Sequence, residues 1–214
     1  MLHGVLDPQP GNLGFALFDG DSKIFEYDLP MRGRDAAALP GFVETKLADA
    51  GKTLADVKLW TVGSGPGSFT FLRMVAALCA GWKYACPETH FRCVPGAVAL
   101  AGALDLADGE EGFALYDGRN KEILCFGVKR CGSDYTASGT AEVLNALQAE
   151  TFFASRPEVK TAVFACEAEA VAKIIPPAIK VVPLKPSLAI LAQNKTVGFD
   201  DILDDLVYIR PALY

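Results

Sequence analysis

The segment that most constrains the fold of this chain is a glycine-rich stretch between two apolar runs. Residues 63–73 read GSGPGSFTFLR, a strand-like run of residues 58–63 leads into them, and an apolar, helix-like run of residues 69–85 follows. Glycine permits a tight turn, Ser68 or Thr70 can cap a helix, and free N–H groups at a helix start can hold an anion. The stretch predicts a strand–turn–helix joint. Its local chemistry leaves open whether the joint binds an anion or only connects the two elements.

Further strand and helix patterns supply the sheet on which such a joint must pack. An Asp-Gly turn at Asp19-Gly20 separates two strand-like runs, as is typical of a hairpin. We expect strands at residues 2–6, 14–18, 24–29, 58–63, 91–94, 113–116, 123–128, 160–165 and 179–182. We expect helices at residues 39–50, 68–85, 96–107, 140–149, 167–175 and 186–193. Hairpins followed by alternating helices and strands predict mixed sheets with helices packed on them.

The polar stretch of residues 108–112, which reads DGEEG, is the best candidate for a domain boundary. We therefore expect a first domain at residues 1–107 and a second at residues 108–214. Residues 14–20 read GFALFDG and residues 112–118 read GFALYDG. Either a duplicated half or two similar hairpins would account for this likeness.

Composition excludes several classes of protein. The 214 residues are 51% hydrophobic and 21% charged, which excludes disorder as the main state. The net charge of −6 argues against gripping nucleic acid by bulk electrostatics. The N-terminus lacks the basic and apolar regions of a signal peptide, and the apolar run at residues 69–85 is too short to cross a bilayer as a helix. With six cysteines and no C-x-x-C pair, we expect reduced thiols, a cytoplasmic location and no membrane contact.

Sequence motifs for common chemistries are missing. The only histidines, His3 and His90, form no H-x-x-x-H or H-E-x-x-H pair, so no metal site is expected. No G-x-S-x-G elbow, P-loop or G-x-G-x-x-G run occurs. The expectation from these residues is a protein without a recognisable catalytic centre.

Three motifs resemble those of the TsaB (YeaZ) family. The run Gly65-Pro66-Gly67-Ser68-Phe69-Thr70, with Arg73 three residues on, is similar to that family's signature. Asp117-Gly118-Arg119 with Glu122 resembles the hairpin that opens the family's second half. Tyr208-Ile209-Arg210 resembles its closing Tyr-Leu-Arg. The motifs occur in the family's order and span most of the chain.

The resemblance implies a fold and a role. It implies a two-lobe α/β fold of the actin-like, sugar-kinase-like (ASKHA) class, with mixed sheets and a reduced second lobe. It implies a non-catalytic paralogue of TsaD that supports TsaD in tRNA threonylcarbamoyladenosine modification, has no catalytic residue or metal of its own, and forms a homodimer when alone. The implied partners are a TsaD-like protein and a TsaE-like ATPase, with tRNA reached only through the complex. No cofactor is implied beyond weak ADP or ATP binding with a partner.

The sequence departs from the family at positions where a nucleotide would be approached. Asp7 is followed by Pro8 and Gln9 where the family has Asp-Thr-Ser, and Pro8 lacks a backbone donor. Phe71 stands where the family has glycine. Asp7 and its counterpart Asp117 are weak candidates for nucleotide contact. The departures indicate a divergent member.

The apolar helix predicts a partner interface, because its large side chains lie on all sides and a sheet covers only one. The candidate interface residues on this helix and the preceding one are Leu39, Phe42, Val43, Leu72, Val75, Leu78, Cys79 and Trp82. Burial by loops of the same chain is the alternative.

Two other functions stay open. One is an ASKHA-type phosphotransferase acting on a small molecule, which requires a catalytic carboxylate such as Asp7 or Asp117. The other is a glycoprotease-like peptidase, for which neither a metal pair nor a triad is visible.

Overall fold

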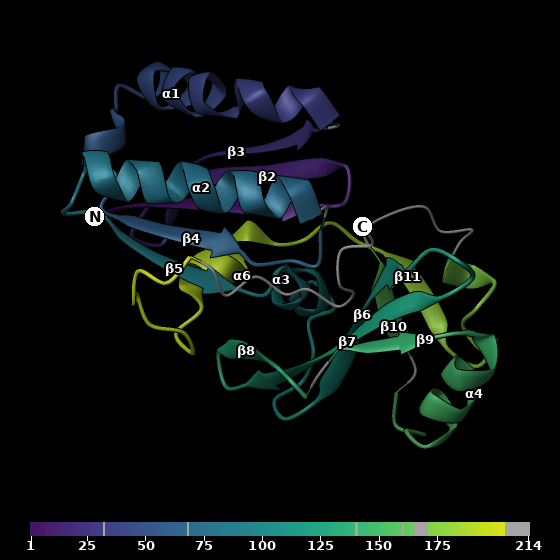
Figure 1. Cartoon of the computed structure of the whole chain (residues 1–214). Helices are drawn as coiled ribbons and strands as arrows, with labels where there is room; N and C mark the ends of the chain where they lie inside the picture. The colour runs from purple at the N-terminus through teal and green to yellow at the C-terminus, as the bar shows by residue number, and fades with distance from the viewer. Residues whose placement is uncertain (32, 68, 140, 160, 165–170, 204–214) are drawn as a thin grey trace. The chain divides into compact units, whose positions relative to one another are not determined.

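The protein consists of two compact units in a computed structural model that describes residues 1–31, 33–67, 69–139, 141–159, 161–164 and 171–203 (Figure 1). The first unit contains Met1–Gly96 and residues 191–203, and the second contains Ala97–Ile190. The first unit thus ends before the expected boundary at residue 107, and the chain returns to it after the second unit. Contacts from strand β5 to residues 191–203, described below, are the physical reason for this return.

The first unit is a five-stranded mixed sheet with helices packed on it. Its strands are β1 (Leu2–Gln9), β2 (Asn12–Asp19), β3 (Ser22–Pro30), β4 (Leu59–Gly63) and β5 (His90–Val94). Its helices are α1 (Leu39–Asp49), preceded by a 3₁₀ turn at Gly33–Ala38, and α2 (Phe69–Ala85); a further 3₁₀ turn spans Leu54–Asp56. The chain then enters the second unit through α3 (Gly96–Gly102). The order across the sheet is β3-β2-β1-β4-β5. β1, β2 and β3 pair antiparallel, whereas β4 pairs parallel with β1 and β5.

The second unit repeats this arrangement of strands. Its strands are β6 (Glu111–Asp117), β7 (Ile123–Cys131), β8 (Asp134–Ala137), β9 (Glu142–Leu144), β10 (Thr161–Phe164) and β11 (Lys180–Pro183). Among its described residues, the helices are α3, α4 (Ala146–Ala154) and the start of α6 (Leu188–Gln193). The sheet order is β11-β10-β6-β7-β8, with β9 pairing β7. β6, β7 and β8 pair antiparallel, and β10 pairs parallel with β6 and β11.

The two sheets therefore share one strand order, in which β6 corresponds to β1 and β7 to β2. Asp7 on β1 and Asp117 on β6 occupy corresponding strands, as the sequence comparison with the family implied. The GFALFDG run lies on β2, whereas the GFALYDG run lies on β6. Their likeness thus joins strands that do not correspond, so it reflects similar hairpins and not the duplication.

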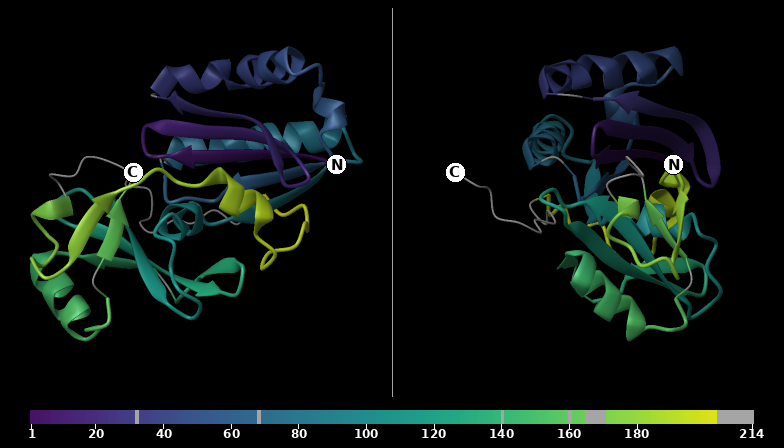
Figure 2. Two further views of the ribbon diagram at one scale, coloured as in Figure 1. Left: turned by 180° about the vertical axis from the view of Figure 1, so that it is seen from behind. Right: turned by 90° about the vertical axis from the view of Figure 1, so that its right-hand side faces the viewer.

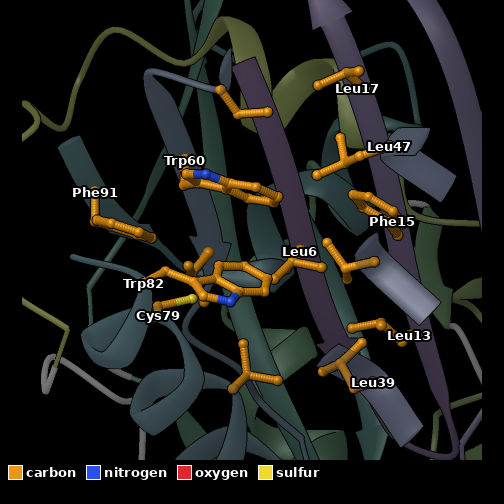
Figure 3. Close-up of a cluster of buried hydrophobic side chains, with 14 of the residues drawn as sticks. Leu6, Leu13, Phe15, Leu17, Leu39, Leu47, Trp60, Cys79, Trp82 and Phe91 are labelled. Carbon is orange, nitrogen blue, oxygen red and sulfur yellow. The ribbon is translucent and has the colours of Figure 1, made fainter. Parts of the chain in front are cut away.

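The core of the first unit lies between one face of its sheet and helices α1 and α2 (Figures 1 and 2). Figure 3 shows its aromatic centre, where the Trp60 and Trp82 rings lie 4.9 Å apart and Trp60 stacks on Phe15. Trp60 lies across Gly4 of the neighbouring strand, where a Cβ atom would be 2.5 Å from the indole ring. Glycine at position 4 is what lets the indole pack flat against β1.

The opposite face of the sheet anchors residues 191–203. Arg92 alternates with the core residues of β5, and its guanidinium donates to the carbonyl groups of Leu191, Ala192, Asn194 and Val197. These acceptors end α6, where carbonyl groups lack helical partners.

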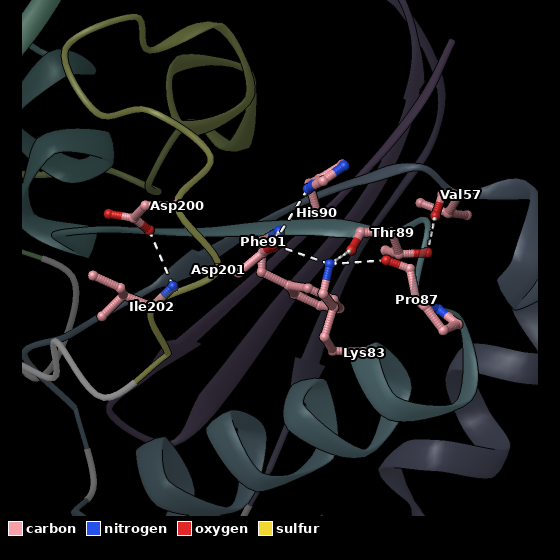
Figure 4. Close-up of polar contacts among 9 residues, drawn as sticks. All are labelled: Val57, Lys83, Pro87, Thr89, His90, Phe91, Asp200, Asp201 and Ile202. Carbon is pink, nitrogen blue, oxygen red and sulfur yellow. Dashed lines mark hydrogen bonds and ion pairs between the residues drawn. The ribbon is translucent and has the colours of Figure 1, made fainter.

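At the rim of the same sheet, Asp201 accepts from Phe91 N at 2.8 Å and its own N–H donates to Phe91 O at 3.0 Å. Lys83 and His90 pair with the same carboxylate at 3.0 and 3.3 Å (Figure 4). The segment is therefore fastened both to the face of the sheet and to the outer edge of β5.

Several sequence expectations are confirmed. The hairpin at Asp19-Gly20 joins β2 to β3, and Gly51 follows α1 with a φ of +68° and leaves room for the Lys52 N–H to reach Leu47 O at 2.9 Å. Within the described ranges, none of the helices combines the length and apolar character needed to cross a bilayer.

Other expectations are wrong at the level of elements. The helix expected at residues 140–149 is a short strand, β9, followed by α4, because Asn145 caps a helix there by accepting from Gln148 N. Strand β8 was not expected, and α3 ends at Gly102, not at residue 107. The helix expected at residues 167–175 lies partly outside the described residues.

Candidate functional site

The glycine-rich joint and the end of β1 meet at the carboxyl edge of the parallel strands. β4 ends at Gly63, and the Gly65 carbonyl accepts from Gly96 N at 2.8 Å at the start of α3. Ser64 N donates to Val94 O at 2.9 Å. The joint thus bridges β4 to the end of β5, and α2 follows from it. This is the edge at which ligands bind in open α/β sheets.

The joint's glycines have different tasks. Gly65 has a φ of +108° and precedes the cis peptide to Pro66, so its conformation suits glycine alone. Gly67 does not have a positive φ; a Cβ atom there would lie 2.5 Å from Pro8 O. A side chain at position 67 is therefore excluded by the close approach to β1 and not by the backbone conformation. Ser68, the predicted helix cap, lies outside the described residues.

Asp7 is the buried ionisable group of this edge. Only 1% of its surface is exposed, and its Oδ2 accepts from Gln9 Nε2 at 2.9 Å. Gln9 is two residues along the same strand, so both side chains lie on one face. Burial raises the pKa of Asp7 to about 6, and the hydrogen bond from Gln9 offsets part of that rise.

Glycines make the space that Asp7 fills. A Cβ atom on Gly63 would lie 2.0 Å from Asp7 Oδ1, and one on Gly96 would lie 2.7 Å from it. Gln9 and Gly96 were not singled out in the sequence. The strand expected at residues 2–6 stopped short of Asp7 and Gln9, so their shared face became visible only when the structure extended β1 to Gln9. Only the fold brings Gly96 to this edge.

Asp117, the second candidate for nucleotide contact, has a local role. It is exposed at the end of β6, and its Oδ1 accepts from Arg119 N at 2.8 Å. Arg119, Asn120 and Lys121 all have positive φ, between +50° and +61°. Asp117 therefore stabilises a tight left-handed turn between β6 and β7.

The candidate interface residues divide into core and surface. Leu39, Val43, Leu72, Val75, Cys79 and Trp82 are buried within the isolated chain. Their burial against the sheet removes them from any partner surface. Phe42 and Leu78 are partly exposed beside the same core. Phe71, which replaces the family's glycine, is also buried.

The outward face of α2 carries a different set of side chains. Thr70, Arg73, Met74, Ala77, Gly81 and Tyr84 are exposed and recur every three or four residues. Such spacing forms one stripe along a helix. Tyr84 is 91% exposed and Met74 is 36% exposed. Small residues between two large ones leave a shallow surface on which another helix can pack.

The described residues offer little support for a metal site or for a histidine that activates a nucleophile. No group of three or more histidine, cysteine or acidic side chains converges there as a metal site would require. His3 Nε2 and the Thr61 hydroxyl lie 2.8 Å apart, and burial together with the charge of Arg92 lowers the pKa of His3 to about 4. His3 is therefore neutral at pH 7 and contributes to the anchoring face of the sheet.

Neither a family model nor a curated protein sequence matches the chain. Solved structures do match. A Pseudomonas aeruginosa protein described as similar to peptidase YeaZ superimposes with a TM-score of 0.74 at 18% identity, over 98% of this chain and 99% of that one. The chain has the fold of YeaZ proteins. YeaZ from Pseudomonas aeruginosa itself superimposes with a TM-score of 0.69 at 19% identity, over 89% of this chain and 88% of YeaZ.

The YeaZ fold accounts for nearly the whole chain, including both sheets. The repeated strand order, antiparallel then parallel, is the arrangement expected for the actin-like, sugar-kinase-like class, so the predicted fold class is confirmed. In the described part of the second unit, β9 and α4 stand between β8 and β10, where the first unit has α1 between β3 and β4.

Proposed function

We propose that this chain is a divergent TsaB-like protein, a non-catalytic partner subunit that supports a TsaD-like protein in tRNA threonylcarbamoyladenosine modification. The observation that carries the proposal is the YeaZ fold over nearly the whole chain, with the GPGSFT motif at the joint between β4 and α2. The motif is structural in this setting, because its glycines make the close approaches that hold β1, β4 and α3 together.

The Asp7 edge supports a role without catalysis. The carboxylate is engaged by Gln9, and Pro8 presents no N–H donor beside it. A phosphate-binding loop needs backbone donors directed at the ligand. Pro8 therefore contributes no backbone donor to such a loop beside Asp7.

The outward face of α2 is the proposed partner surface, in place of the buried residues expected from the sequence. Met74, Ala77, Gly81 and Tyr84 would pack against a helix of the TsaD-like protein, or of a second copy when that protein is absent. A TsaE-like ATPase would join the complex, and tRNA would be held by the partners, since this chain has a net charge of −6.

The test is binding to the TsaD-like protein of the same source. Ala77→Glu places a charge in the middle of the outward face of α2 without entering the core. We expect it to abolish co-purification with the TsaD-like protein and to shift any homodimer to monomer in sedimentation, with circular dichroism unchanged. Leu147→Glu is the matched control, because Leu147 is 73% exposed on α4.

Two outcomes would overturn the proposal. One is full binding and full support of tRNA modification by the Ala77→Glu variant. The other is ATP hydrolysis or peptide cleavage by the purified wild-type chain that is lost on Asp7→Asn substitution, because that result would assign an enzymatic function to the Asp7 edge.

A further inference from the structure

The second unit contains a cavity that the proposed function does not use. It has a volume of about 190 Å³ and lies between the sheet and the C-terminal end of α4. Glu111, Glu142 and Arg156 contribute charged groups to its lining, and Phe113 and Phe152 contribute aromatic ones. Drug-sized ligands occupy pockets of roughly 300–1,000 Å³, so this volume suits a ligand of amino-acid size.

Charged residues line this cavity at positions where the sheet pattern predicts apolar ones. Phe113 and Leu115 of β6 face the core, and Glu111 is two residues before Phe113 on the same face. Glu142 of β9 is paired directly with Cys125, another core residue. A local pattern broken in this way is typical of functional sites.

Gly127 forms the floor of the cavity. Its register partner is Phe113, and a Cβ atom there would lie 2.4 Å from Ser138 Oγ and 2.9 Å from Glu111 Oε1. The missing side chain leaves room for the hydrogen bond in which Ser138 Oγ donates to Glu111 Oε1. This bond holds Glu111 at the wall and occupies only one of its two carboxylate oxygens.

Arg156 is held in place opposite the acidic groups. Its guanidinium stacks 3.8 Å from the centre of the Phe152 ring, and Nη1 donates to Phe152 O at 3.0 Å. In the described part of the chain, no ion pair joins Arg156 to Glu111 or Glu142, and Glu142 has no hydrogen-bond partner. Charges of both signs thus line one small cavity without a direct ion pair between them among the described residues.

We propose that this cavity binds a basic amino acid, with Arg156 holding its carboxylate and Glu111 and Glu142 holding its two ammonium groups. Arginine matches a carboxylate with two parallel donors. Two carboxylates with free acceptor positions match two ammonium groups, and the aromatic rings of Phe113 and Phe152 pack against the aliphatic part. The three charges of the ligand then complement the three charges of the cavity.

The test is calorimetric titration of the full chain with three probes: L-lysine, cadaverine, which lacks the carboxylate, and L-norleucine, which lacks the terminal ammonium. We expect L-lysine to bind and each analogue to bind at least about tenfold more weakly, because each loses a charge-assisted contact. Glu142→Gln should weaken L-lysine binding by about tenfold or more. This variant keeps the fold, since Glu142 is exposed and makes no hydrogen bond among the described residues.

Arg156→Gln tests the contact to the carboxylate of the ligand separately from the contacts to its ammonium groups. It should weaken the binding of L-lysine but not that of cadaverine, because cadaverine has no carboxylate for Arg156 to hold and its two positive charges are repelled by the guanidinium. The thermal unfolding profile is recorded for each variant. The control is Glu150→Gln, which changes an exposed carboxylate on α4 outside the cavity. This variant should bind L-lysine like the wild type. The proposal is overturned by no binding of L-lysine at millimolar concentration, by equal binding of L-lysine and cadaverine, or by equal losses in Glu150→Gln and Glu142→Gln.

Discussion

Asp7 and Asp117 lie on corresponding strands of the two units but in opposite environments. Asp7 is enclosed by Gly63, Gly96 and Gln9, whereas Asp117 is open to solvent and bonds only its own turn among the described residues. Sequence reasoning treats them alike, because each follows an apolar strand. Their difference arises from what the fold packs against each carboxylate.

Replacement of Asp7 by asparagine should stabilise the protein at alkaline pH. The folded-state pKa of about 6 lies above the ordinary aspartate pKa of 3.8, so ionisation of Asp7 opposes folding and stability falls as pH rises between these values. We expect Asp7→Asn to raise the free energy of unfolding by up to about 3 kcal/mol at pH 8 and by little at pH 4. Urea unfolding at both pH values measures this.

Asp117→Asn is the control for that pH dependence, since asparagine keeps the acceptor for Arg119 N. It should leave stability unchanged within about 0.5 kcal/mol at both pH values. A gain for Asp7→Asn that is as large at pH 4 as at pH 8 would contradict burial of the charge as its cause.

At the scale of elements, the joint between β4 and α2 depends on glycines that make space for β1. Gly63 and Gly67 are required by atoms of Asp7 and Pro8, which are distant in sequence. The joint itself was predicted from the sequence, because a strand-like run, a glycine cluster and an apolar helix occur in succession. The residues that contact its glycines could not be predicted, because the pairing of β1 with β4 brings them there.

Gly63→Ala should destabilise the protein through one identified contact. The new Cβ atom would overlap Asp7 Oδ1, and overpacking of this kind costs about 1–3 kcal/mol. Asp7→Ala in the same chain should recover part of that loss, which a double-mutant cycle measures as a coupling of about 0.5–3 kcal/mol. Gly41→Ala is the control, because its added methyl meets nothing within 4 Å and should not destabilise α1. Purely additive effects of Gly63→Ala and Asp7→Ala would refute the contact.

At the scale of the whole molecule, the chain leaves the first unit at Gly96 and returns to it at residue 191. Arg92 holds much of the returning segment, since it donates to four carbonyl groups and its guanidinium lies 4.5 Å from the centre of the Phe199 ring. A single buried cation therefore satisfies the end of α6 and fastens a segment distant in sequence.

Arg92→Met should loosen residues 191–203 before it unfolds the sheet. Loss of the charged donors should cost at least about 3 kcal/mol. Hydrogen exchange should speed up at amides of this segment, notably at Asp201, while the amides of β1 and β4 stay protected. As a control, Lys23→Met on the exposed β3 strand should change neither the exchange of residues 191–203 nor the protection of β1 and β4. Uniform loss of protection across the first unit would show that Arg92 supports the whole sheet and not the segment.

Local elements bounded by clear turn or cap residues could be predicted from the amino-acid sequence. The Asp19-Gly20 hairpin, the end of α1 at Gly51 and the strand–glycine–helix joint were predictable, because turn chemistry and periodicity act between residues close in the chain. The fold class also followed, through motifs carried in the right order.

Which apolar face of α2 is buried and which is exposed could be learned from the three-dimensional packing alone. Its side chains are apolar nearly all round, so periodicity could not choose, and packing against the sheet buried Val75 and Cys79 while leaving Met74 and Tyr84 outside. The same holds for Arg92, Gly96 and Glu111, whose roles depend on partners far along the chain. Such contacts are set by strand order and register, which no local pattern encodes.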